Sequence, residues 1–168
     1  MTKHRTPQHR KNQHQNAVWG AGLLMALCSP TASAQLCTTS VVAPVFGVYR
    51  SAGNGNSANG VINVSCVVNG VVPQSVLYTV KLELSAQAQG TQRRMTSGSN
   101  SLQYNIYCSS SYSQVWADGN NSTCMASGGQ PNLLGTLLGV HPVYGRIPGG
   151  QFVAPGTYTD NIAVQVLY

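Results

Sequence analysis

The end of the chain carries the pattern that most restricts its fold. In residues 156–168, GTYTDNIAVQVLY, six side chains fall on one face of an extended strand: Tyr158, Asp160, Ile162, Val164, Val166 and Tyr168. Small or polar side chains fall on the other face, and Leu167 is the one large apolar exception. This period of two predicts a half-buried β-strand. Because no strand follows it in the sequence, we expect it at a sheet edge or beside an unfilled place in the sheet.

The same alternation recurs along the sequence, and no stretch has sustained helical periodicity. Three stretches place apolar side chains at every second position: 61–68, 76–84 and 102–108. Shorter strands are expected in four more places, the third of which could instead be a short helical turn: 38–46, 113–116, 133–138 and 143–147. Clusters of Gly, Asn and Ser have the composition of turns and occupy three places: 53–60, 97–100 and 118–122. Short strands separated by turns predict an all-β sandwich.

Residues 1–34 have the three parts of a secretory signal peptide. A positive segment holds four basic side chains: Lys3, Arg5, Arg10 and Lys11. An apolar run at 17–28 and the small residues at 32–34 follow. The run is shorter than the roughly 20 residues of a membrane-spanning helix, and the bulky Leu27 before Cys28 argues against a lipoprotein. We expect export to the periplasm and then to the cell surface or beyond, with a single mature domain at 35–168.

Removal of this leader changes the charge balance. The sequence has nine Lys and Arg against three Asp and Glu, but four of the basic residues lie in the leader. The mature domain is therefore close to neutral, with eight charged side chains: Arg50, Lys81, Arg93, Arg94, Arg146, Glu83, Asp118 and Asp160. Nucleic acid binding needs a clustered basic surface, so no nucleic-acid partner is expected. We expect the Arg93-Arg94 pair in a solvated turn.

Four cysteines remain after the leader, an even number in an exported chain, which indicates disulfides. Four cysteines allow three pairings, and the sequence alone does not choose among them. We favour Cys37–Cys66 and Cys108–Cys124. Zinc is the competing interpretation, but no C-x-x-C spacing occurs and the mature chain has one histidine, His141. We therefore expect no metal and no cofactor.

The mature sequence lacks the residue groups that common hydrolytic mechanisms need. No G-x-S-x-G motif accompanies His141, which we place in a turn, so a Ser-His-acid triad is unsupported. Glycoside hydrolysis needs two carboxylates about 5–9.5 Å apart. Glu83 is expected to point outward, and Asp118 to bond its own backbone in a turn. Asp160 is expected to hold a loop or to pair with an arginine such as Arg146. We expect no enzyme.

Four motifs, in order along the mature chain, resemble the spore coat protein U domain family. Residues 46–49 (FGVY) and 64–66 (VSC) are similar to its early F-G-x-Y and V-x-C elements. Residues 102–107 (LQYNIY) are similar to its L-x-Y-N-L-Y strand, and GRIP at 145–148 with GTYTD at 156–160 to its closing run. The structural motif comprises ten residues: Phe46, Gly47, Tyr49, Tyr104, Asn105, Gly145, Arg146, Gly156, Tyr158 and Asp160.

The resemblance implies a secreted immunoglobulin-like β-sandwich that lacks its final strand. Many members are pilin subunits of archaic chaperone–usher pili, which serve cell adhesion and biofilm formation. A periplasmic chaperone fills the gap first, and the N-terminal extension of a neighbouring subunit fills it later. The implied partners are therefore the chaperone, the usher and neighbouring pilins. The implied strand-accepting edge has four residues: Ile162, Val164, Val166 and Tyr168. The alternative is a self-contained secreted spore-coat or matrix protein.

The expected mature N-terminus departs from a polymerising pilin. If cleavage follows Ala34, only Gln35 and Leu36 precede Cys37, whereas even a short strand needs about five residues. Such a chain would accept a strand and give none, as a tip or terminating subunit would. Tip adhesins of such pili carry two domains, which argues against the tip.

Most tyrosines are expected to pack on inward strand faces. Three aromatic residues near the expected Cys108–Cys124 loop are candidates for a surface ligand loop: Tyr107, Tyr112 and Trp116.

Overall fold

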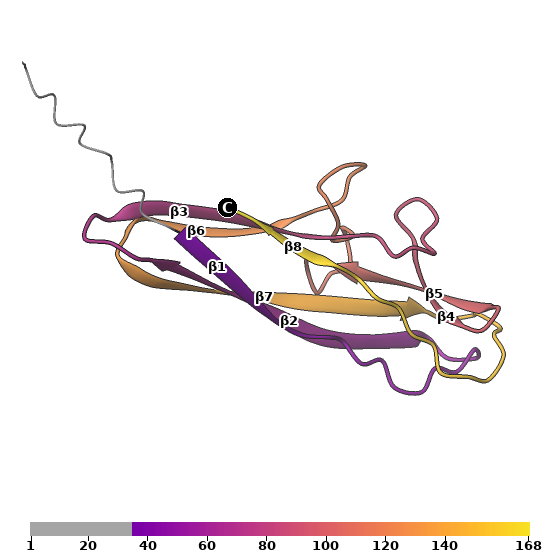
Figure 1. Ribbon diagram of the computed structural model, residues 1–168. Helices are drawn as coiled ribbons and strands as arrows, with labels where there is room; N and C mark the ends of the chain where they lie inside the picture. The colour runs from indigo at the N-terminus through magenta and orange to yellow at the C-terminus, as the bar shows by residue number, and fades with distance from the viewer. Residues whose placement is uncertain (1–34) are drawn as a thin grey trace, which may run out of the picture. The chain divides into compact units, whose positions relative to one another are not determined.

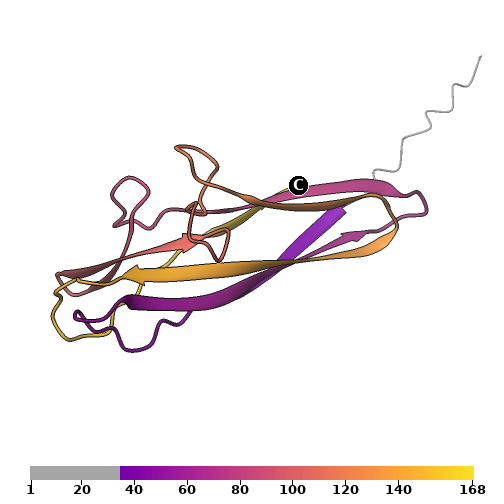
Figure 2. The same cartoon turned by 180° about the vertical axis from the view of Figure 1, so that it is seen from behind.

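The computed structural model describes residues 35–168, which form two antiparallel β-sheets and no helix (Figure 1; Figure 2). The five-stranded sheet has the order β1-β2-β7-β5-β4 and the three-stranded sheet the order β6-β3-β8. The strands are β1 (Gln35–Val42), β2 (Gly55–Val68), β3 (Gln74–Leu82), β4 (Arg93–Ser97), β5 (Asn100–Tyr107), β6 (Ala126–Leu133), β7 (Gly135–Pro148) and β8 (Val164–Leu167). The expected leader lies outside the described residues.

Alternating side chains of the long strands fill the space between the two sheets. In β2, β3 and β5 the apolar positions expected from the sequence are buried: Ile62, Val64, Cys66, Val68, Val76, Tyr78, Val80, Leu82, Leu102, Tyr104 and Ile106. Their burial is the main apolar contribution to the fold, at roughly 1.5–3 kcal/mol for each large side chain. The predicted all-β sandwich is confirmed. Within residues 35–168 there is no helix of the length and apolarity that crossing a bilayer requires.

Three predicted turns are strands instead: part of residues 53–60, the Arg93-Arg94 pair and His141. His141 lies within β7, where it pairs with Ile62 of β2, because the ladder between these strands runs on through Pro142. β2 begins at Gly55, inside the Gly- and Asn-rich stretch 53–60, because β7 pairs with it from Gly55↔Pro148 onward. The small residues are needed there: a Cβ on Gly60 would lie 2.4 Å from the carbonyl oxygen of Val42. Ladder pairing and close chain approach therefore outweigh turn propensity in this stretch.

Arg93 is not in a solvated turn. It lies in β4 with 0% of its surface exposed. Its Nη2 donates to the carbonyl oxygens of Glu83 at 3.0 Å and Trp116 at 2.8 Å, and its backbone N–H donates to Asn105 Oδ1 at 3.1 Å. One guanidinium therefore holds the backbone at Glu83 and at Trp116. Of the two arginines, only Arg94 is partly exposed.

Other bounds differ from the expected ones where partner strands decide them. Residues 113–116 make only isolated bridges to Tyr107 and Cys124. Residues 133–138 are extended, since they join the end of β6 to the start of β7. β8 covers four residues, because the chain before it has no ladder partner, although exposure still alternates from Tyr158 to Leu167. β8 pairs with β3 and forms an edge of the three-stranded sheet.

Two disulfides form, in the pairing favoured above: Cys37–Cys66 and Cys108–Cys124. The first joins β1 to its neighbour β2 at the register pair of the two cysteines. The second closes the loop after β5. The closed loops span 29 and 16 residues, so both bridges restrict the unfolded chain.

Candidate functional site

A long groove opens between the two sheets on the side where β8 is the edge strand. Its volume is about 1090 Å³, which is above the usual range for a small-molecule site. One wall is residues 41–52, from the end of β1 onward, and the other is residues 151–164, which lead into β8. In Figure 1 these are the purple loop between β1 and β2 and the yellow segment leading to β8. The floor is apolar apart from Tyr104 and consists of core residues: Leu82, Met95, Leu102, Tyr104, Ile106, Val143 and Ile147.

The wall at residues 43–49 has an unpaired backbone. Within the described chain these residues make no backbone–backbone hydrogen bond, and Asn56 Nδ2 donates to the carbonyl oxygens of Phe46 and Val48, both at 2.9 Å. Val45 and Val48 are 84% and 79% exposed. Solvated apolar side chains on an unpaired extended segment are what a missing neighbouring strand leaves behind.

The opposite wall is open in the same way. Thr159 exchanges backbone hydrogen bonds with Thr96 of β4, at 2.9 and 3.1 Å. Successive residues of an extended chain turn their N–H and C=O groups to opposite sides, so those of Tyr158 and Asp160 are turned toward the groove. Neither residue makes a backbone–backbone hydrogen bond in the part of the chain described. Both walls therefore offer free donors and acceptors to a strand laid between them.

The motif residues from the two halves of the chain meet around this groove. The Phe46 ring packs edge-on to the Tyr104 ring, with centroids 5.8 Å apart. Gly145 makes room for it, because a Cβ there would lie 2.7 Å from the Phe46 ring. Tyr49 Oη donates to the carbonyl oxygen of Pro148 at 3.1 Å and accepts from the backbone N–H of Gln151 at 2.8 Å. These contacts hold the first wall beside the second.

Asp160 is anchored to the floor. Tyr104 Oη donates to Asp160 Oδ2 at 2.7 Å, and the backbone N–H of Asn161 donates to Oδ1 at 2.8 Å. Burial raises the pKa of the Tyr104 phenol, and the hydrogen bond to Asp160 raises it further. Tyr104 therefore stays a hydrogen-bond donor at physiological pH.

Arg146 does not pair with Asp160. Its guanidinium lies 5.2 Å from the ring centroid of Tyr112, on the other side of β7 from the groove residues. Within the described residues the one ion pair closer than 4.0 Å joins Lys81 to Glu83. Of the other motif residues, Asn105 is buried and holds the backbone of Arg93, and Tyr158 Oη donates to the carbonyl oxygen of Ala154 at 2.7 Å.

The expected accepting edge is only partly in the groove. Ile162 and Val164 line it, whereas Val166 lies beyond its end and packs on the core. Tyr168 is 58% exposed and is not among the lining residues. The strand-accepting edge expected from the sequence did not include the wall at 41–52. The FGVY motif could have indicated it, because Phe46 and Tyr49 point inward while Val48 is exposed.

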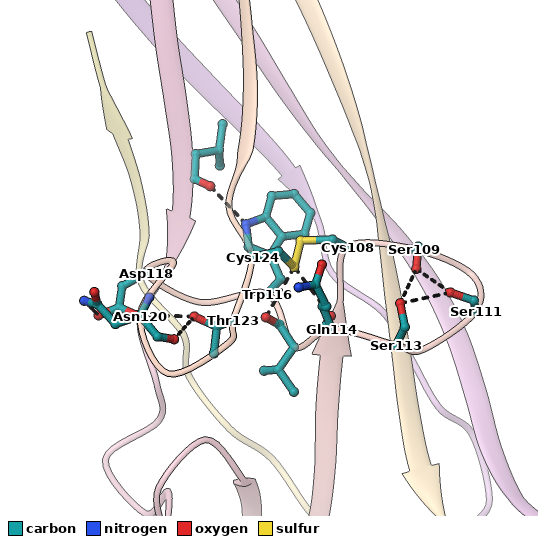
Figure 3. Close-up of a disulfide and its surroundings, with 12 residues drawn as sticks. Cys108, Ser109, Ser111, Ser113, Gln114, Trp116, Asp118, Asn120, Thr123 and Cys124 are labelled. Carbon is teal, nitrogen blue, oxygen red and sulfur yellow. Dashed lines mark hydrogen bonds between the residues drawn. A yellow bond between two sulfur atoms is a disulfide. The ribbon is translucent and has the colours of Figure 1, made fainter.

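The three aromatic residues near the second disulfide do not form one exposed surface. Trp116 is 1% exposed, and its Nε1 donates to the carbonyl oxygen of Val80 at 2.9 Å. Figure 3 shows its ring beside the Cys108–Cys124 bridge. Its burial contradicts the expected ligand-loop role, because a large apolar ring next to a bridge is a core element. Tyr107 and Tyr112 are partly exposed and pack edge-on, with centroids 5.4 Å apart.

The loop itself is held by short-range polar contacts. As Figure 3 shows, Asp118 accepts from Asn120 and Thr123, and the hydroxyls of Ser109, Ser111 and Ser113 bond to one another. Asp118 thus bonds local backbone, as expected from its turn. In residues 35–168 no group of three or more His, Cys, Asp or Glu side chains could hold a metal ion.

The family model of the Spore Coat Protein U domain matches residues 23–165. The chain belongs to this family. The match spans both walls of the groove and all four motifs. No curated protein is significantly similar to the sequence. A solved structure that matches is the CsuC–CsuE chaperone–tip adhesion subunit pre-assembly complex from archaic chaperone–usher Csu pili of Acinetobacter baumannii. That match has 22% identity and a TM-score of 0.48, and it covers 79% of this chain and 40% of the solved chain.

Proposed function

We propose that this Spore Coat Protein U domain is an exported, non-enzymatic subunit of an archaic chaperone–usher pilus, completed by a β-strand from another protein. A periplasmic chaperone would supply the strand first and a neighbouring pilin subunit would replace it after passage through the usher. The observation that supports the proposal is the groove, which has an apolar floor and, on each wall, residues whose backbone groups lack backbone partners: 43–49 on one wall, and Tyr158 and Asp160 on the other.

The groove geometry favours an extended peptide over a compact ligand. Apart from the floor, its lining residues fall in two stretches of chain, at 41–52 and within 151–164. A strand rises about 3.3 Å per residue, so a peptide of similar length would contact both walls throughout. Main-chain hydrogen bonds would then supply affinity, and alternate side chains would fill the apolar floor.

The first residues of the described chain favour a terminal place in such a pilus. Gln35 and Leu36 already lie in β1, where they pair with Val68 and Val67 of β2. If the leader is removed after Ala34, neither residue is free to act as a donor. The mature subunit would then receive a strand without giving one, which is the role of a tip or terminating subunit.

The test is thermal unfolding of the oxidised domain, residues 35–168, with and without synthetic ten-residue peptides. The test peptide alternates Val and Thr, and a control peptide has the same composition in scrambled order. Only the alternating peptide should raise the unfolding temperature, by ten degrees or more, because insertion buries a row of apolar side chains and pairs both walls.

A matched pair of variants locates the effect. Ile162→Asp puts a charge into the groove, whereas Ala163→Asp puts the same charge on the exposed side of the next residue. The first variant should lose the response and the second should keep it. A domain that is highly stable alone and ignores every alternating peptide would instead be a self-contained coat or matrix protein.

A further inference from the structure

We propose that the strand received by the groove must carry one hydrogen-bond donor side chain, opposite Asp160, within an otherwise apolar row. The inference rests on the proposed function and specifies the chemistry of the partner strand. It makes Asp160, supported by Tyr104 and Arg93, the residue that sets the register of the incoming strand.

Asp160 is the charged side chain that reaches into the groove. Two charged residues line it in the described chain: Arg50, which is exposed at the rim, and Asp160, which is partly buried. The inward positions that follow Asp160 along the same wall are Ile162 and Val164. A strand laid against this wall therefore meets a carboxylate at one level and aliphatic side chains at the next two.

The Asp160 carboxylate has unused acceptor capacity. Its two oxygens offer about four lone-pair sites. Tyr104 Oη and the backbone N–H of Asn161 use one site on each oxygen, at 2.7 and 2.8 Å. No further hydrogen bond or ion pair to Asp160 occurs among the described residues. In the open groove water can satisfy the remaining sites, and a strand that fills the groove would displace that water.

Arg93 lies behind this pair and does not supply the missing donor. It is fully buried, and its Nε and Nη1 have no hydrogen-bond partner. Burial lowers the pKa of its guanidinium, and the negative charge of Asp160 acts against that shift. Asp160 is therefore a counter-charge of a buried cation, although the two side chains are not within ion-pair distance of each other.

The backbone places a partner side chain beside Asp160. The Thr159–Thr96 bridge turns the backbone groups of Asp160 toward the groove. A residue paired with Asp160 would have its Cβ about 4.5–5.5 Å away, on the same face. A Ser, Thr, Asn or Lys side chain at this position can donate to the carboxylate. A Val there would bury unsatisfied acceptors, which is costly.

The test uses three ten-residue alternating peptides whose inward positions hold only Val, Val with one central Thr, or Val with two adjacent Thr. Thr and Val have nearly the same shape. The affinity of each for the oxidised domain is measured by isothermal titration calorimetry. The peptide with one Thr should bind about tenfold more tightly than the all-Val peptide. A second Thr should weaken binding, because it meets Ile162 or another aliphatic neighbour.

Asp160→Asn is the matched variant, because its amide keeps the shape and contains its own donor. In this variant the preference for one Thr should fall below about threefold, while Asp118→Asn, in the distant loop, should leave the preference unchanged. If Asp160→Asn does not fold, the ranking of the three peptides on the wild-type domain still decides. Equal or tighter binding of the all-Val peptide would overturn the inference and leave the strand-accepting groove intact. Failure of all three peptides to bind would overturn both.

Discussion

Replacing Arg93 should test whether one buried cation organises the domain. Arg93→Met keeps the length and apolar stem of the side chain but removes the guanidinium. The carbonyl oxygens of Glu83 and Trp116 then lose their donor while remaining enclosed. Hydrogen bonds to a charged group contribute about 1.5–3 kcal/mol each. Relief from burying two unpartnered nitrogens, Nε and Nη1, offsets part of this loss.

The net destabilisation should be about 2–4 kcal/mol. For a domain of this size, one kcal/mol shifts the unfolding temperature by roughly 3–4 °C, so the variant should melt about 10 °C lower. The neighbouring Arg94→Met is the control, because Arg94 is partly exposed and bonds the exposed side chain of Gln89. Its effect should stay within about 1 kcal/mol.

Urea unfolding, followed by the fluorescence of Trp116, measures both variants in one assay. If Arg93→Met costs no more than Arg94→Met, the guanidinium does not hold the two loops. The description of Arg93 as the buried support of Asp160 would then be wrong.

Three further predictions follow from the same structure. Removing Cys37–Cys66 by double alanine substitution should destabilise the fold by about 3.5 kcal/mol from loop closure, and removing Cys108–Cys124 by about 3 kcal/mol. Because Cys66 is fully buried, the first variant also loses core packing, so the gap between the two variants in urea unfolding should be larger than loop closure alone gives. Equal destabilisation of the two variants would contradict this. Gly145→Ala should destabilise the first groove wall through its clash with Phe46; Ala58→Gly, the substitution at its register partner, is the control, and unchanged proteolysis of residues 43–52 would refute the expected loosening. Burial lowers the pKa of His141, so the folded state resists protonation of this side chain. The stability that neutral His141 contributes is fully present above its ordinary pKa of about 6.5 and is lost as the pH falls below that value. His141→Gln should therefore reduce the change in urea midpoint between pH 7.5 and pH 5.

The strands of the core could be predicted because each has apolar side chains at every second position, a pattern that is visible within the strand itself. Residues 61–68 and 76–82 alternate so regularly that burial follows the pattern residue by residue. β4 and β6 could not be predicted in this way, since their sequences are mostly polar and they are strands because they pair with neighbouring strands. RRMTS pairs with β5, and ASGGQPNL lies along β3 with glycines that leave space for Tyr78.

The site was predictable from one side only. The alternation of residues 158–164 indicated an inward face, and the structure places Ile162 and Val164 in a groove wall. The opposite wall, 43–49, has no period of its own, because it is extended without a ladder partner. Its position depends on hydrogen bonds from Asn56, eight and ten residues away in sequence, and on the bond from Tyr49 to Pro148, 99 residues away. The FGVY motif marks this segment in the sequence, but it does not indicate which residues the segment contacts.

The scarcity of surface charge has a consequence for how the free subunit must be handled. Proteins that expose unpaired strand edges usually protect them with charged side chains. Here Val45 and Val48 are exposed on an open wall, and one of the five Lys and Arg side chains in residues 35–168, Arg93, is buried. Electrostatic repulsion between free copies is therefore weak. If the groove accepts a strand as proposed, each open groove can also take an extended segment of another chain, and the time for which the free domain stays in solution should depend on how quickly its groove is filled.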